Sequence, residues 1–91
     1  MTSLIVEYDL CSPGRDYEEL YKAIKSYRVC VPITESTWYI KTDETCVQVR
    51  DKLMARMDKN DRIFVAALTG AAAWSNVLCN SESLKKNLEG R

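Results

Sequence analysis

The chain has 91 residues, 46% hydrophobic and 29% charged, a composition that suits one folded domain and excludes a disordered chain. Lysine and arginine balance aspartate and glutamate at thirteen each, so the chain lacks the basic excess typical of proteins that grip nucleic acid through its phosphates. The absence of histidine excludes the commonest general base and the commonest transition-metal ligand from any site.

The first half of the chain predicts a strand, a helix and two apolar stretches of strand character. Residues 4–10 alternate apolar and polar side chains, which is typical of a strand. Residues 16–27 carry apolar side chains every three or four positions after a capping aspartate, which predicts a helix. Residues 29–33, with Pro32 at the strand end or on a sheet edge, and residues 36–42 form either a hairpin or one bent strand.

A second helix is expected after residue 42, and a second strand-like run follows it. The helix begins either at Thr42 or Asp43 or one turn later, where Thr45 and Gln48 have capping-box spacing. Its apolar stripe consists of residues 46, 49, 53 and 57, and Val47 and Met54 widen the stripe. Residues 62–69 are almost continuously apolar, which predicts a strand in the middle of the sheet.

The remaining residues predict a tail behind the core. Residues 71–80 form either an irregular crossing anchored by Trp74 or a fifth strand that reaches toward a partner. Residues 81–88 have the spacing of a short terminal helix, with Gly90 as its terminator.

The element order predicts an α+β fold, the ferredoxin-like β-α-β-β-α-β sandwich with a short C-terminal helical tail. We expect one domain over residues 1–91, with a core at 3–70 and a tail at 71–91. Helices on one sheet face leave the other face exposed, so we expect a homodimer. The four cysteines lack metal-site spacing and the chain opens on a strand pattern, so we expect reduced thiols, a cytoplasmic location and no membrane segment.

Asp9 is the most informative candidate residue, because it closes the first strand just before a Pro-Gly turn. Glu7 precedes it by two residues, so both carboxylates point to one sheet face. Two copies of Asp9 at a dimer axis could hold a magnesium ion that activates water against a phosphodiester. Alternatively, Asp9 accepts backbone hydrogen bonds within the turn that follows.

Other polar and aromatic residues have two interpretations each. Arg15, close behind Asp9, is either a phosphate contact or a surface ion pair with Asp16 or Glu19. Ser36 could position a phosphate or a metal-bound water. Basic side chains recur along the second helix and beyond as a phosphate track or a solvated face: Lys52, Arg56, Lys59 and Arg62. Trp38 and Tyr39 point to opposite faces, so one is expected to lie exposed, as a subunit interface or a base-stacking platform.

Two stretches carry a resemblance to a known family. Val6–Leu10 followed by Pro13, Gly14 and Arg15, together with Glu35–Trp38, resembles the CRISPR-associated Cas-two family. The Pro-Gly-Arg-Asp-Tyr start of the first helix, and Asn-Asp before the last core strand, are similar to its SinR-family branch. The resemblance covers roughly residues 3 to 75.

The resemblance implies a ferredoxin-like fold, a homodimer across the sheets and a strand-end aspartate, Asp9 by position, that holds catalytic magnesium in some relatives. Relatives include metal-dependent nucleases and a non-catalytic DNA scaffold. One hypothesis is therefore a magnesium-dependent nuclease or a binder of RNA or DNA, with Asp9 on the metal and Arg15 and Ser36 on nucleic acid. The other is a non-enzymatic homodimeric protein-interaction module on the same fold.

Overall fold

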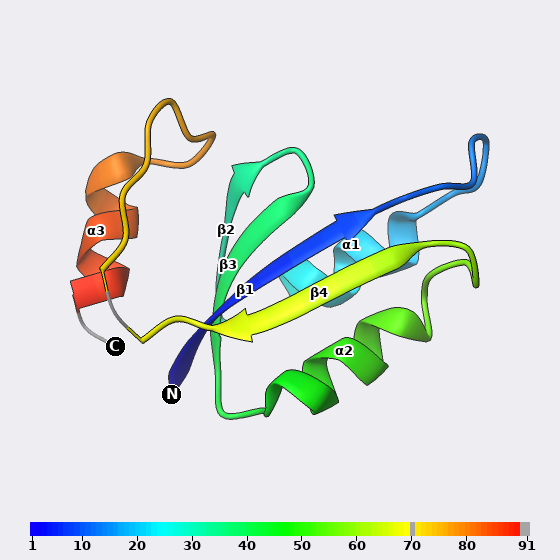
Figure 1. Cartoon of the computed structure of the whole chain (residues 1–91), viewed down its shortest axis with the longest axis horizontal. Helices are drawn as coiled ribbons and strands as arrows, with labels where there is room; N and C mark the ends of the chain where they lie inside the picture. The colour runs from blue at the N-terminus through cyan, green and yellow to red at the C-terminus, as the bar shows by residue number, and fades with distance from the viewer. Residues whose placement is uncertain (70, 90–91) are drawn as a thin grey trace.

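The computed structural model describes residues 1–69 and 71–89 as a small α+β domain with one sheet (Figure 1). Gly70 and Gly90, expected to close the core and the last helix, lie outside the described residues. The elements follow in the order β1 (Thr2–Asp9), α1 (Glu18–Lys25), β2 (Val29–Thr34), β3 (Thr37–Thr42), α2 (Cys46–Met54), β4 (Arg62–Ala67) and α3 (Ser81–Glu89).

The four strands form an antiparallel sheet in the order β2-β3-β1-β4. The two apolar stretches of the first half are therefore a hairpin, and Pro32 lies on an edge strand beside an irregular register, where its missing N–H costs least. The expectation that residues 62–69 lie mid-sheet is wrong. β4 is the other edge strand: among the described residues no strand pairs with its outer side, and its apolar run is only half buried.

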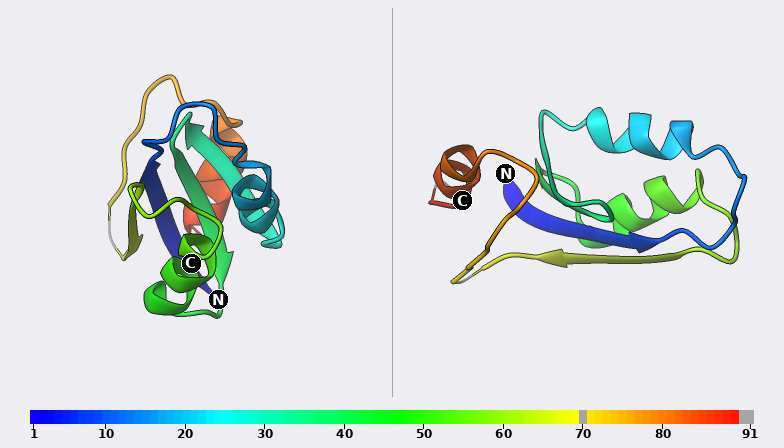
Figure 2. Two further views of the ribbon diagram at one scale, coloured as in Figure 1. Left: turned by 90° about the vertical axis from the view of Figure 1, so that its right-hand side faces the viewer. Right: turned by 90° about the horizontal axis from the view of Figure 1, so that it is seen from above.

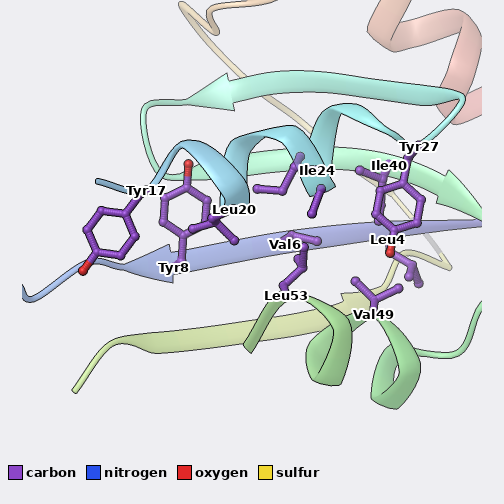
Figure 3. Close-up of a cluster of buried hydrophobic side chains, with 11 residues drawn as sticks. Leu4, Val6, Tyr8, Tyr17, Leu20, Ile24, Tyr27, Ile40, Val49 and Leu53 are labelled. Carbon is purple, nitrogen blue, oxygen red and sulfur yellow. The ribbon is translucent and has the colours of Figure 1, made fainter. Parts of the chain in front are cut away.

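Both α1 and α2 pack on the same face of the sheet (Figure 2, right). Alternation along β1 turns Leu4, Val6 and Tyr8 toward these helices, where they form the main core. The other buried members of this core come from the helices, the loop positions beside them and β3 (Figure 3): Tyr17, Leu20, Ala23, Ile24, Tyr27, Ile40, Val49 and Leu53.

The starts of the two helices differ in how they are capped. α2 begins at the later of the two expected positions. The Thr45 side chain accepts a hydrogen bond from the Gln48 backbone N–H, and the Gln48 side chain accepts one from the Thr45 backbone N–H. Asp16 accepts the amide of Glu18 instead of forming a capping box, and α1 begins two residues later than expected. Val47 and Met54 are exposed, so they do not widen the buried stripe of α2.

The C-terminal arm, residues 71–89, covers one end of the face opposite α1 and α2. Residues 71–80 run as an irregular crossing with Trp74 packed against the sheet, and α3 buries Leu84 and Leu88 there. Tyr39 lies fully buried beneath this arm, so the expectation of an exposed aromatic on this face is wrong. Trp38 is half-buried against the main core.

No helix among the described residues is long and apolar enough to span a bilayer. All four cysteines are free thiols with partly buried side chains.

Candidate functional site

The arm leaves the other end of its sheet face open, and we call this region the uncovered end. It consists of exposed or half-buried side chains from three strands: Glu7, Asp9, Thr37, Arg62 and Phe64. Alternation places Glu7 and Asp9 on this face as expected, because Leu4, Val6 and Tyr8 face the helices. The first candidate residue, Asp9, therefore lies on an accessible surface.

Asp9 is held by an arginine from the neighbouring strand. It pairs in register with Arg62 of β4, and Nη1 of Arg62 donates a 2.7 Å hydrogen bond to Oδ2 of Asp9. Both side chains are well exposed, at 65% for Asp9 and 72% for Arg62, so the ion pair is screened by water. The same guanidinium contacts the Cys11 sulfur at 3.1 Å, and the hydrogen bond to Asp9 is the main cause of the raised pKa of Arg62.

Glu7 and Ser36 border the same hollow as Asp9. This hollow has a volume of about 460 Å³ and is lined by Glu7, Tyr8, Asp9, Leu10, Tyr21, Glu35 and Ser36. Ser36 lies in the β2–β3 turn, where its carbonyl accepts the Tyr8 amide. A second hollow of about 230 Å³ lies on the β4 side of Asp9 and includes Arg62 and Phe64. The structure thus brings Glu7, Asp9 and Ser36 together in surroundings that are mainly acidic.

Tyr8 forms the wall between this hollow and the core. Its hydroxyl accepts a hydrogen bond from the Trp38 indole and donates to the Glu35 carbonyl. Burial raises the pKa of Tyr8 above its ordinary value, although the hydrogen bond from Trp38 opposes the shift. Tyr8 therefore stays neutral and acts as a fixed wall.

Arg15 lies in a different cluster, where it stacks on Tyr17 and pairs with Asp58 at 3.5 Å. Its ion pair is therefore with the α2–β4 loop and not with Asp16 or Glu19. This cluster joins the β1–α1 loop to the α2–β4 loop, because Ser12 also donates to Asp58. Backbone and hydroxyl hydrogen bonds, first from Asn60 and then from Ser12, lower the pKa of Asp58.

Asp61 is the centre of this loop junction. Its carboxylate accepts the amides of Cys11 and Asp58 and the hydroxyl of Tyr17, at 2.6, 2.8 and 2.9 Å respectively. Burial raises the pKa of Asp61, but these hydrogen bonds outweigh it and the net shift is downward. Through these bonds Asp61 holds the β1–α1 loop and Tyr17 against the α2–β4 loop.

The basic residues of α2 and the loop after it do not form one track. Lys52 binds Glu44 at 2.8 Å and lies over the Tyr27 ring, while Arg56 donates to the Lys52 carbonyl. Arg62 belongs to the uncovered end. The solvated face is therefore the interpretation that these contacts favour.

The described part of one chain offers few carboxylates that converge near Asp9. Among residues 1–69 and 71–89, no three aspartate, glutamate, cysteine or histidine side chains gather closely enough to hold a metal ion. The Oδ2 atom of Asp9, a prospective ligand, is already hydrogen-bonded to Arg62. A magnesium ion at Asp9 would bind beside the Arg62 guanidinium and take its remaining ligands from water or from other groups.

Sequence reasoning missed Arg62 and Asp61 as partners of these loops and strands. If β1 and β4 are antiparallel neighbours, Arg62 at the start of β4 faces Asp9 at the end of β1, and this pairing of charges is the signal that could have revealed the contact.

Neither the protein-family models nor the curated proteins contain a match to this chain.

Proposed function

We propose that this chain is a Cas-two-like protein of ferredoxin-like fold that acts as a non-enzymatic homodimeric protein-interaction module. The element order from β1 to β4 and the sheet order β2-β3-β1-β4 support the fold, since two β-α-β halves interleave in this way. The motifs around Asp9, Arg15 and Trp38 support the family.

The exposed side chain of Phe64 is the single observation on which the proposed protein-interaction module rests. Its side chain is 64% exposed on the uncovered end of the sheet, opposite Glu7 in the β1–β4 register and two residues from Arg62. An aromatic side chain ringed by charges is typical of protein interfaces, where it supplies contact area while the charges select the partner. Burial of Phe64 against a partner removes that apolar surface from water.

The charges around the hollow favour a protein partner over a nucleic acid. Glu7, Asp9 and Glu35 line it, and Arg15 is occupied by Asp58 elsewhere. Carboxylates repel a phosphate backbone, whose binding depends on lysine and arginine.

The module is tested by sedimentation equilibrium of the wild-type chain over a wide concentration range. We expect a reversible monomer–dimer equilibrium. A chain that remains monomeric at every concentration would overturn the homodimer.

A magnesium-dependent nuclease is the second candidate, favoured by the common face of Glu7 and Asp9 beside Ser36. Its test compares RNA and DNA cleavage by the wild type and by Asp9→Ala, with and without magnesium. Asp16→Ala is a matched control, because Asp16 is an exposed aspartate in the loop before α1. Magnesium-dependent cleavage that Asp9→Ala alone abolishes supports the enzyme, and cleavage that both variants retain excludes the Asp9 mechanism.

A further inference from the structure

The C-terminal arm has a hydrophobic cluster of its own, which we call the arm cluster. Its buried members are Leu84 and Leu88 of α3 and Tyr39 of β3. Partly buried side chains from β2, from the position after β4 and from the arm complete it: Val29, Val31, Ile33, Leu68, Trp74, Val77 and Cys79. The main core contains none of these residues and lies on the other face of the sheet. The arm therefore packs on the domain without forming part of its main core.

The seam between the arm and the sheet is loosely packed. It contains a hollow of about 120 Å³, lined by Ile5, Ile33, Tyr39, Leu68, Ala72, Ala73, Trp74, Leu84 and Leu88. Side chains that border such a gap lose dispersion contacts on that side, so protein interiors normally close it. Ala72 and Ala73 of the arm have only a methyl group each with which to fill the space. A layer packed in this way opens at a lower free-energy cost than the main core.

The hydrogen bonds that tie the arm to the sheet lie on its β2 and β3 side. The Leu78 amide donates to the Ile33 carbonyl of β2, and the Asn87 carbonyl accepts from the Tyr39 hydroxyl of β3. In Figure 1 the arm leaves β4, and α3 lies beside β2. Water replaces both bonds when the arm lifts, so each of them holds the arm only modestly.

The uncovered end is small for a dimer interface. It presents five exposed or half-buried side chains, Phe64 among them. A standard interface between proteins has about 20–30 residues and buries about 800 Å² on each partner. A stable homodimer on this face therefore needs more of the sheet than the arm leaves open.

The surface beneath the arm continues directly from Phe64. Alternation from Phe64 brings Leu68 to the same face, and Leu68 belongs to the arm cluster whereas Phe64 is exposed. On β1, Ile5 lies two residues before Glu7 on this face and pairs in register with Tyr39. Lifting the arm therefore joins Phe64 to a wider apolar surface across β1, β3 and β4.

We propose that the arm is a reversible cover over the homodimer interface, so that the arm and a second copy of this chain compete for one sheet face. This inference rests on the proposed homodimer and names what regulates it. In the closed state the arm shields Tyr39 and its neighbours, and the uncovered end alone is free to bind. In the open state the wider face packs against the open face of the partner.

The competition determines how the dimer responds to the strength of arm packing. Pairing requires an open arm, so the apparent dissociation constant rises as the open fraction falls. Because both copies must open, a tenfold rise in the open fraction lowers the apparent constant about a hundredfold while closed arms predominate. If the arm instead contributed contacts to the dimer, weakening its packing would raise the constant.

The test weakens the arm with a substitution that leaves the sheet face unchanged. Leu84→Ala truncates a side chain of the arm cluster that is 3% exposed and lies outside the main core. We expect it to lower the dimer dissociation constant, measured by sedimentation equilibrium, at least tenfold. Leu78→Ala is the matched control: Leu78 is 62% exposed on the arm, so its truncation should leave the constant unchanged.

Hydrogen exchange separates opening of the arm from unfolding of the domain. The Leu78 amide reports on the arm, because it is bonded to the Ile33 carbonyl only while the arm is closed. Leu84→Ala should reduce the protection of this amide, whereas the amides of β1 should keep theirs. Equal loss of protection at both places would mean that the variant unfolds as a whole and would overturn the arm as a separate cover.

A second substitution checks that the tighter dimer uses the sheet face. Phe64→Lys added to Leu84→Ala should raise the dissociation constant at least tenfold, because pairing on this face buries the new charge. A wild-type dimer whose constant Leu84→Ala leaves unchanged or raises would overturn the competition but keep the module. If the wild type and Leu84→Ala both remain monomeric at every concentration, the homodimer and its cover are overturned together.

Discussion

Replacing Tyr39 with phenylalanine tests how the C-terminal arm is held on the sheet. The Tyr39 hydroxyl lies 2.6 Å from the Ser3 hydroxyl and 3.2 Å from the Asn87 carbonyl of α3. A carbonyl only accepts, so Tyr39 donates to Asn87 and Ser3 donates to Tyr39. One hydroxyl thus links β1, β3 and α3.

The expected cost follows from burial. The Tyr39→Phe variant keeps the ring and leaves no large cavity, but the buried Ser3 hydroxyl loses its acceptor and the Asn87 carbonyl its donor. An unsatisfied buried polar group costs about 1–3 kcal/mol, so Tyr39→Phe should lower the free energy of unfolding by about 2 kcal/mol. For a domain of this size the melting temperature should fall by roughly 8–16 °C.

The double variant isolates the hydrogen bond between Tyr39 and Ser3. Ser3→Ala removes the hydroxyl that donates to Tyr39 but keeps the hydrogen bond from Tyr39 to the Asn87 carbonyl, so this variant should lower the free energy of unfolding by only about 0.5–1 kcal/mol. In the Ser3→Ala background, Tyr39→Phe should cost about 1 kcal/mol less than in the wild type. The assay is urea unfolding followed by circular dichroism, with Tyr21→Phe as the exposed-tyrosine control. Strictly additive single-variant costs, or a Tyr39→Phe variant as stable as the wild type, would refute the linkage.

Three further perturbations have defined outcomes. Thr45→Ala should destabilise the chain by about 1 kcal/mol in urea unfolding and Thr45→Ser far less, because serine keeps the cap of α2; equal losses would contradict the capping role. Asp61→Asn should be less stable than wild type at pH 7. Because the folded pKa of Asp61 lies below its ordinary value of 3.8, its stabilisation is complete above pH 3.8 and is lost as the pH falls below it. The stability gap should therefore close in acid, and a gap that widens there would contradict the assignment. Arg62→Met should change the free energy of unfolding by at most about 1 kcal/mol, and added salt should erase the difference, because the Asp9–Arg62 pair is exposed; a large, salt-independent loss would contradict this.

Local chemistry in the sequence predicted several features of the fold. Alternation along residues 4–10 gave the faces of β1, and Thr45 with Gln48 marked one of two possible starts of α2. Both depend on residues within one turn or one strand, where side-chain direction follows from backbone geometry.

Features that depend on distant segments could not be read in the same way. The apolar run of β4 has the composition of a central strand, and only the sheet order shows that it is an edge. The burial of Tyr39 depends on the arm folding back, and its partner Asn87 comes 48 residues later in the chain. Arg15 meets Asp58, and Asp9 meets Arg62, because β1 and β4 are neighbours, which no spacing in the sequence encodes.

The unequal protection of the sheet edges limits how many chains can join. Growth into a filament needs two accessible edges on each molecule, so that every new subunit offers a further site. The proline, the irregular register and the Leu78 hydrogen bond obstruct such a site on β2. The β2 side of the sheet is therefore closed to a further strand, and chain-to-chain growth through both edges is obstructed.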